Sequence, residues 1–154
     1  MCGIVGLYLK NDSLQPRMGE LITPMLDRMS DRGPDSAGLA IYRDEAPADS
    51  VKLTLRRLSD DVIWEAIDTS LTNRFGGDVP LRENGSYAVV VVKGTEQEVV
   101  DYLADAHPGI RVMSAGRKIE IFKEAGHPEE ISKKFGFKDL YGSHAIGHTR
   151  MATE

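Results

Sequence analysis

The chain opens with a short, almost wholly apolar run, Cys-Gly-Ile-Val-Gly-Leu-Tyr-Leu at residues 2–9. An apolar run of this length predicts a β-strand that is buried on both faces. A helix is expected next, because apolar side chains recur at helical spacing from Met18 to Met29. Further strands are expected at 37–43, 51–57 (half-exposed), 87–92, 110–114, 119–123 and 143–149, and further helices at 60–74, 95–106 and 128–136. Strands and helices are therefore mixed along the chain, which predicts an α+β fold.

Size and composition are those of an ordinary soluble domain. The chain has 154 residues, 41% of them hydrophobic and 28% charged, a balance typical of one globular domain. Its net charge of −5 argues against a nucleic-acid partner, which would need a concentrated basic surface. No apolar run reaches the ~18–20 residues that span a bilayer, and the N-terminus lacks the features of a signal peptide. A single cysteine permits no internal disulfide, so we expect a cytoplasmic protein without a membrane segment.

Cys2 is the only cysteine, and it directly follows Met1. Methionine aminopeptidases generally remove Met1 when the next side chain is small, which would leave Cys2 with a free α-amine beside its own thiol. An α-amine has an unperturbed pKa of about 7.7–8.0, so part of it is unprotonated near neutral pH and can act as a base. Nucleophile and base then belong to one residue, the N-terminal form of an activated nucleophile. The alternative is that Cys2 is a small buried hydrophobic residue, as free cysteines usually are.

Two later segments favour the catalytic interpretation: Asp31-Arg32-Gly33-Pro34-Asp35-Ser36-Ala37-Gly38 and Ile146-Gly147-His148-Thr149-Arg150-Met151-Ala152-Thr153. Together with the N-terminal Cys-Gly-Ile-Val-Gly run, they resemble the class II glutamine amidotransferases, whose glutaminase domain belongs to the N-terminal nucleophile (Ntn) hydrolases. All three segments occur in the family's order. The resemblance covers residues 1 to about 43 and about 143 to 154. It implies a four-layer αββα sandwich, of which residues 1–154 would be the N-terminal portion.

The resemblance also implies roles for individual residues. Cys2 would attack the side-chain amide of L-glutamine. Arg150 matches the arginine that binds the substrate's α-carboxylate, which a guanidinium can hold with two hydrogen bonds, and Thr153 matches a threonine beside that carboxylate. Arg32 and Asp35 are expected to order the site through hydrogen bonds. His148 matches the motif's histidine and is expected to support the site structurally and not to act as a catalyst. No metal and no cofactor is expected.

The middle of the chain departs from the family pattern. Arg32 and Arg150 are 118 positions apart, a distance that many family members cover in a few dozen residues. We therefore expect a small inserted α+β lobe at about 76–138. The glutaminase domains of glutamate synthases and of the related N-methylglutamate synthase subunits also carry extra material there.

The family's oxyanion-binding asparagine-glycine pair follows the HTR motif, and so does its amine-binding aspartate. Neither has a counterpart before Glu154, so a fragment of a longer protein is expected. Asn84-Gly85 precedes the motif and predicts only a turn.

The expected function is hydrolysis of L-glutamine to glutamate and ammonia, with the ammonia passed to a synthase domain or subunit. Two alternatives stay open: a non-catalytic glutamine-sensing or assembly subunit, and an Ntn hydrolase that acts on another amide. Arg150 argues against the second alternative, because it offers a site for an amino-acid carboxylate. His144 and His148 would share one face of a strand, but the residues near them supply no third or fourth metal ligand.

Overall fold

The computed structural model describes residues 3–77 and 80–149. Two compact units make up the chain. Unit 1 comprises residues up to Asp44 and from Ile121 onward, and unit 2 spans Glu45–Glu120. Each unit has a β-sheet with two α-helices, so the predicted α+β class is confirmed. None of the helices in these two described ranges is both long and apolar enough to cross a membrane.

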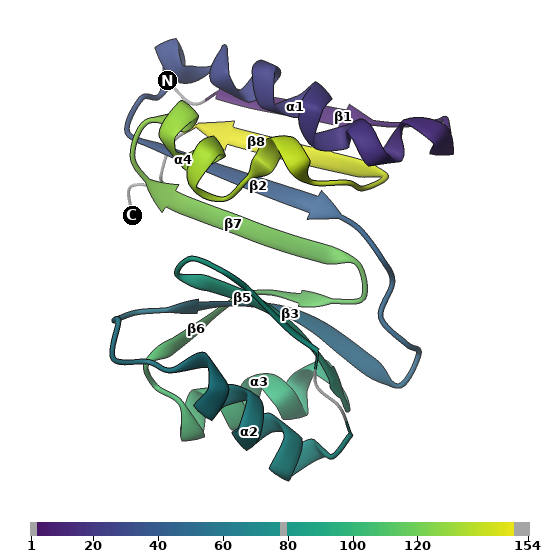
Figure 1. The fold of residues 1–154 in the computed structure, drawn as a ribbon, viewed down its shortest axis with the longest axis vertical. Helices are drawn as coiled ribbons and strands as arrows, with labels where there is room; N and C mark the ends of the chain where they lie inside the picture. The colour runs from purple at the N-terminus through teal and green to yellow at the C-terminus, as the bar shows by residue number, and fades with distance from the viewer. Residues whose placement is uncertain (1–2, 78–79, 150–154) are drawn as a thin grey trace. The chain divides into compact units, whose positions relative to one another are not determined.

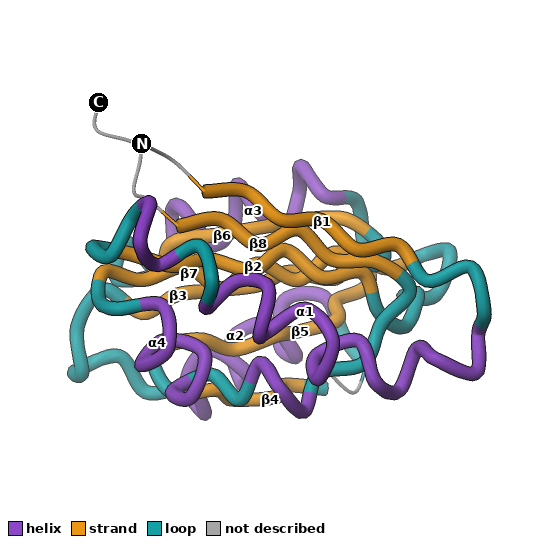
Figure 2. The backbone as a smooth tube through the Cα atoms, turned by 90° about the horizontal axis from the view of Figure 1, so that it is seen from above, coloured by secondary structure: helices purple, strands orange, loops and turns teal. Residues whose placement is uncertain are grey.

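Unit 1 is built on a four-stranded sheet in which the first and the last described strands are neighbours. The strand order is β1 (Gly3–Tyr8), β8 (His144–Thr149), β2 (Ser36–Tyr42) and β7 (Ile119–Ala125). β8 runs antiparallel to both β1 and β2 and lies between them (Figures 1 and 2). The register pairs Gly3 with Thr149 and Gly38 with His148. Three segments that are distant in sequence therefore meet in one sheet.

Helices α1 (Met18–Asp27) and α4 (Pro128–Lys134) belong to unit 1 and are drawn against its sheet in Figure 1. The apolar stripe predicted for α1 is confirmed, because Met18, Ile22 and Leu26 are buried. A Cβ added at Gly147 of β8 would lie 3.0 Å from Leu26 Cδ1 and 2.9 Å from Val5 Cγ2. Alternate residues of β1 and β8 thus pack beneath α1. Short 3₁₀ segments at Asp12–Arg17, Ser30–Arg32 and Phe137–Asp139 complete the unit.

The opposite side of this sheet, its open face, carries exposed apolar side chains of β1 and β8. Ile4 and Tyr8 of β1 are 67% and 66% exposed, and Ile146 of β8 is 49% exposed. Side chains in a strand alternate between the two faces, so these residues share the face opposite Val5 and Gly147. The prediction that residues 2–9 are buried on both faces is therefore wrong for the described part of the run.

Unit 2 contains the second sheet, in the order β4 (Leu81–Asn84), β5 (Tyr87–Lys93), β3 (Ser50–Arg57) and β6 (Ile110–Gly116). Helices α2 (Trp64–Phe75) and α3 (Glu96–Ala106) cover one face (Figure 1). Trp64, Ile67 and Leu71 of α2 and Val99 and Leu103 of α3 form a core with alternate residues of β3 and β5. The capping box predicted at Thr95 and Glu98 is present. The turn predicted at Asn84-Gly85 is also confirmed, because it joins β4 to β5 with Gly85 at a φ of 62°.

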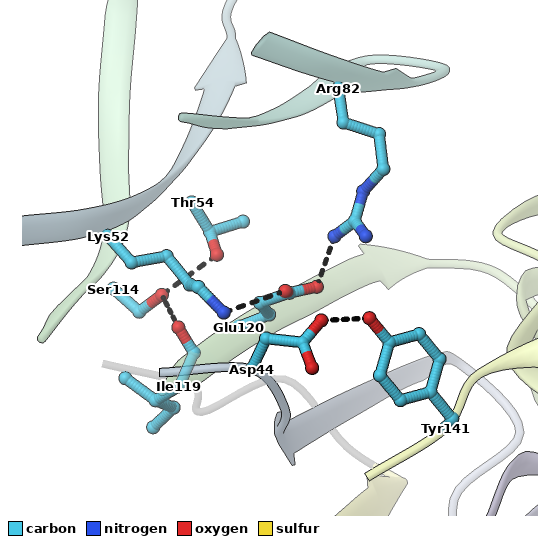
Figure 3. Close-up of polar contacts among 8 residues, drawn as sticks. All are labelled: Asp44, Lys52, Thr54, Arg82, Ser114, Ile119, Glu120 and Tyr141. Carbon is cyan, nitrogen blue, oxygen red and sulfur yellow. Dashed lines mark hydrogen bonds and ion pairs between the residues drawn. The ribbon is translucent and has the colours of Figure 1, made fainter. Parts of the chain in front are cut away.

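β3 is more buried than its sequence suggested. Residues 51–55 are all buried, although the alternation of polar and apolar residues predicted a half-exposed strand. Lys52 Nζ lies 3.4 Å from Glu120 Oε1, and Arg82 Nη2 lies 2.6 Å from Glu120 Oε2 (Figure 3). The Ser114 hydroxyl donates to Thr54 Oγ1 at 2.9 Å. Polar side chains of β3 are therefore buried together with polar partners.

The boundaries of unit 2 differ from those expected for an inserted lobe. The compact unit begins at Glu45 and ends at Glu120, whereas the sequence placed the lobe at about 76–138. The helix α4 and the end of β7, which fall inside 76–138, belong to unit 1. The sequence predicted an insertion at about 76–138 relative to other family members, and this stays a prediction.

Candidate functional site

The start of β1 and the end of β8 are in close contact. Gly3 pairs with Thr149, and the Thr149 hydroxyl donates to the Met29 carbonyl oxygen at 3.1 Å. A Cβ added at Gly3 would lie 2.7 Å from both Thr149 Oγ1 and Met29 Cβ. Only glycine fits at this position without movement of its neighbours. The residue that follows Cys2 is therefore packed against the residue that precedes Arg150.

The turn of the Arg32–Asp35 segment packs on the same strand end. A Cβ added at Gly33 would lie only 1.8 Å from the Thr149 carbonyl oxygen, so the backbone of the turn touches the backbone of β8. The far side of the turn is held by a hydrogen bond from the Gly126 amide to the Asp35 carbonyl oxygen at 2.9 Å. All three motif segments of the sequence thus meet at one end of the unit 1 sheet.

Arg32 and Asp35 lie in this turn with exposed side chains. The Arg32 amide donates to the Met29 carbonyl oxygen at 2.9 Å, so its backbone closes the turn. Their proposed role in ordering the site stays a prediction, and of this turn it is Gly33 whose backbone touches Thr149.

His148 is half-buried on the open face of the sheet, between Ile4 of β1 and Gly38 of β2 in the register. Burial, and after it the positive charge of Lys123, lowers the pKa of His148. Both effects favour the neutral imidazole, which can donate from one nitrogen and accept at the other.

His144 shares this face with His148 but has other contacts. Its ring stacks on Tyr42 with ring centroids 3.9 Å apart, and its Nδ1 lies 2.9 Å from Ser143 Oγ. Among the described residues, no three or more histidine, cysteine or acidic side chains are grouped in a way that could hold a metal ion.

Cys2, Arg150 and Thr153 lie outside the described residues. Cys2 is bonded to Gly3 and Arg150 to Thr149, so the described contacts concern their immediate chain neighbours.

Sequence reasoning gave no role to Ser36, the last polar residue of the RGPDS segment. It is fully buried at the start of β2, and its hydroxyl has no hydrogen-bond partner among the residues that the structure describes. The signal that could have pointed to it is its place in that motif.

Comparison with known proteins gives a consistent result. No family model matches the chain. Over its whole length the chain is 41% identical to the glutamine amidotransferase-like protein GlxB of Rhizobium meliloti, of which it covers 51%. This similarity supports the assignment of the chain to a glutamine amidotransferase family. A putative glutamine amidotransferase of Methanothermobacter thermautotrophicus is 29% identical over the whole chain, with 53% of that protein covered.

A shorter match, 34% identical over 64 residues, links 42% of the chain to 10% of a glutamine–fructose-6-phosphate aminotransferase of Thermococcus kodakarensis. The chain spans about half the length of the two curated relatives that it matches throughout.

Proposed function

We propose that the chain carries glutamine-hydrolysing residues of a class II glutamine amidotransferase. The observation that supports this best is the contact of Gly3 and Gly33 with Thr149, because it brings together the three sequence segments expected to form the site. The similarity to a protein named glutamine amidotransferase-like and to one named a putative glutamine amidotransferase gives independent support.

The proposed chemistry begins with removal of Met1. The free α-amine of Cys2 takes the thiol proton, and the thiolate attacks the side-chain amide carbon of L-glutamine. The C–N bond then breaks, and the amine's proton leaves with the nitrogen as ammonia. A γ-glutamyl thioester remains on Cys2. Water hydrolyses the thioester, which releases glutamate and restores the thiol.

Recognition of the substrate would depend on Arg150 and Thr153, which we propose hold its α-carboxylate. Arg32, Asp35 and His148 would keep the site ordered. The lowered pKa of His148 is compatible with such a role, since a neutral imidazole forms hydrogen bonds without adding a charge beside the reacting amide.

The surroundings of the site are also part of the proposal. The ammonia would pass to a synthase domain or subunit, of the glutamate synthase or N-methylglutamate synthase kind. Sheet-on-sheet packing of the four-layer type would cover the open face that carries Ile4, Tyr8 and Ile146. A reducing cytoplasm would keep the Cys2 thiol free.

Labelling of the thiol tests the proposal directly. An electrophilic glutamine analogue should modify Cys2, the only cysteine, and mass spectrometry of the N-terminal peptide should show that Met1 has been removed. Cys2→Ala should abolish both labelling and glutamine turnover. Ser132→Ala, a change at a buried serine of α4, is the matched control and should leave both intact.

Three outcomes would reject or redirect the assignment. Glutamine turnover that persists in Cys2→Ala would show that another group is the nucleophile. Retention of Met1 in an active preparation would exclude the α-amine as the base. Tight glutamine binding without turnover would favour the glutamine-sensing alternative.

A further inference from the structure

One row of polar residues crosses all four strands of the unit 2 sheet near one end. The register pairs Asn84 of β4 with Tyr87 of β5. Arg56 of β3 lies between Tyr87 and Arg111 of β6. Residues directly opposite each other in paired strands share one face of the sheet, with Cβ atoms about 4.5–5.5 Å apart. Leu55, which precedes Arg56, belongs to the core beneath α2 and α3, so Arg56 and Arg111 are neighbours on the opposite face.

These two arginines face each other without an acidic partner. Like charges directly opposite each other destabilise a sheet. In the described part of the chain, neither guanidinium forms an ion pair or a hydrogen bond with an acidic side chain. By contrast, Lys52 and Arg82 of the same sheet share the Glu120 carboxylate (Figure 3). The uncompensated pair therefore indicates that a negative charge from outside the described residues belongs there.

Arg56 is held in place, whereas Arg111 reaches solvent. The Arg56 side chain is half-buried, and its Cζ lies 5.9 Å from the centroid of the fully buried Tyr87 ring. Its Nε is buried and has no acceptor among the described residues. Arg111 is exposed. An anion can therefore approach the pair beside Arg111 and meet a second guanidinium that packing has already oriented, which lowers the entropy cost of binding.

The chemistry of the pair selects the ligand. Guanidinium groups bind phosphate and carboxylate oxygens through two parallel N–H donors and are more weakly hydrated than an ammonium group. An oxyanion between two guanidinium groups would also replace their repulsion by attraction, which no neutral ligand can do.

We propose that Arg56 and Arg111 bind an oxyanion group, a phosphate or a carboxylate, of a small-molecule ligand. The site belongs to unit 2 alone, on the sheet face opposite α2 and α3, and it does not depend on the proposed hydrolysis of glutamine. The chain as a whole carries a net charge of −5, so a general attraction of anions to the protein is not expected.

Titration of the purified protein with inorganic phosphate and with succinate, followed by protein NMR, tests the site. Sodium chloride keeps the ionic strength constant. At least one of the two anions should bind, and the preferred one tells whether the ligand carries a phosphate or a carboxylate. Arg56→Gln and Arg111→Gln should each weaken that binding by about ten- to a hundredfold, as expected for the loss of a charge-assisted hydrogen bond. Arg117→Gln is the matched control, because Arg117 already pairs with Glu45 at 2.9 Å, and it should bind the anion as the wild type does.

Thermal unfolding gives a second measurement whose sign depends on the anion. At low ionic strength without the anion, Arg111→Gln removes the repulsion and should have a higher Tm than the wild type. At a saturating concentration of the anion, bound ligand stabilises the wild type more, so the order of the two Tm values should reverse. Arg117→Gln should show no such reversal.

Three results would overturn the proposal. The first is that the wild type binds neither phosphate nor succinate. The second is that Arg111→Gln binds the anion as tightly as the wild type, and the third is that Arg117→Gln weakens binding as much as Arg111→Gln. Arg111 is exposed, so its replacement should not prevent folding. This variant therefore decides the question even if Arg56→Gln does not fold.

Discussion

Gly33→Ala is the sharpest structural test of how the candidate site is assembled. The φ of Gly33 is −175°, which is extended backbone that alanine adopts without strain. What opposes the change is contact. The added Cβ would lie 1.8 Å from the Thr149 carbonyl oxygen, 2.8 Å from its carbonyl carbon and 3.1 Å from Oγ1. Two of these atoms belong to the backbone of β8, so rotation of a side chain cannot relieve the overlap.

The size of the effect follows from this geometry. An ordinary contact begins at 3.4 Å, so the turn and the strand end would have to separate by about 1.6 Å. Overpacking of this kind costs roughly 1–3 kcal/mol. Replacing glycine also restricts the unfolded chain, which stabilises the folded state by roughly 0.4–1 kcal/mol. We expect the free energy of unfolding to fall by about 1–2 kcal/mol, together with a lower rate of Cys2 labelling by the glutamine analogue.

Gly6→Ala is the matched control. Gly6 lies in β1, and a Cβ added there would meet only the Ala145 carbonyl oxygen, at 4.0 Å. Replacing this glycine also restricts the unfolded chain, so Gly6→Ala should be as stable as the wild type or slightly more stable. Urea unfolding followed by circular dichroism measures both variants. If Gly33→Ala unfolds at the same urea concentration as Gly6→Ala, the packing of the turn on Thr149 is not what holds these segments together.

Two further predictions concern charged groups of the two units. Burial raises the pKa of Asp27, and a hydrogen bond from Ser132 opposes this shift. The folded protein therefore holds the Asp27 proton more tightly than the unfolded chain does. The stability that this proton contributes is lost as pH rises from the unfolded-state pKa through the folded-state pKa. Asp27→Asn should therefore raise Tm at pH 7 but not at about pH 3, and equal gains at both pH values would contradict this. Glu120→Ala should lower the free energy of unfolding by about 3–5 kcal/mol, because it leaves the buried Lys52 ammonium without this carboxylate. Lys134→Ala, which breaks a partly exposed ion pair, is the control and should cost under about 1 kcal/mol in urea unfolding. If Glu120→Ala costs no more than this control, the buried ion pair does not stabilise unit 2 as we expect.

The order of the elements could be predicted because it depends on local patterns. The stripe of α1 shows the 3.6-residue period, and the capping residues of α3 mark its start. β4 was not predicted, since Leu81–Asn84 contains one apolar residue and no alternation. The start of α2 at Trp64, rather than at residue 60, follows from the extended backbone of Ile63. Polarity alone does not mark such a boundary.

Burial was predicted less well, because it depends on partners distant in sequence. Lys52 reads as a solvent-facing residue of an alternating strand. Its partner Glu120 is 68 residues away, and only the assembled unit shows that the two charges lie within 3.4 Å. The reverse error occurred at Ile4 and Tyr8, where an apolar run predicted two buried faces and the sheet has helices on only one. In both cases the polarity of the residue was clear from the sequence. What decides its burial is the presence or absence of a packing partner, and the local sequence does not show this.

At the candidate site, too, the motifs could be found in the sequence, whereas the contacts between them could not. The motif segments predict a chemistry, yet nothing in them indicates that Gly33 packs against the carbonyl of Thr149, 116 residues further along the chain. That contact and the pairing of Gly3 with Thr149 are made largely by backbone atoms. Glycine is required at both points because a Cβ would occupy the space of the partner. We infer that Gly3 and Gly33 serve the assembly of these segments around Thr149.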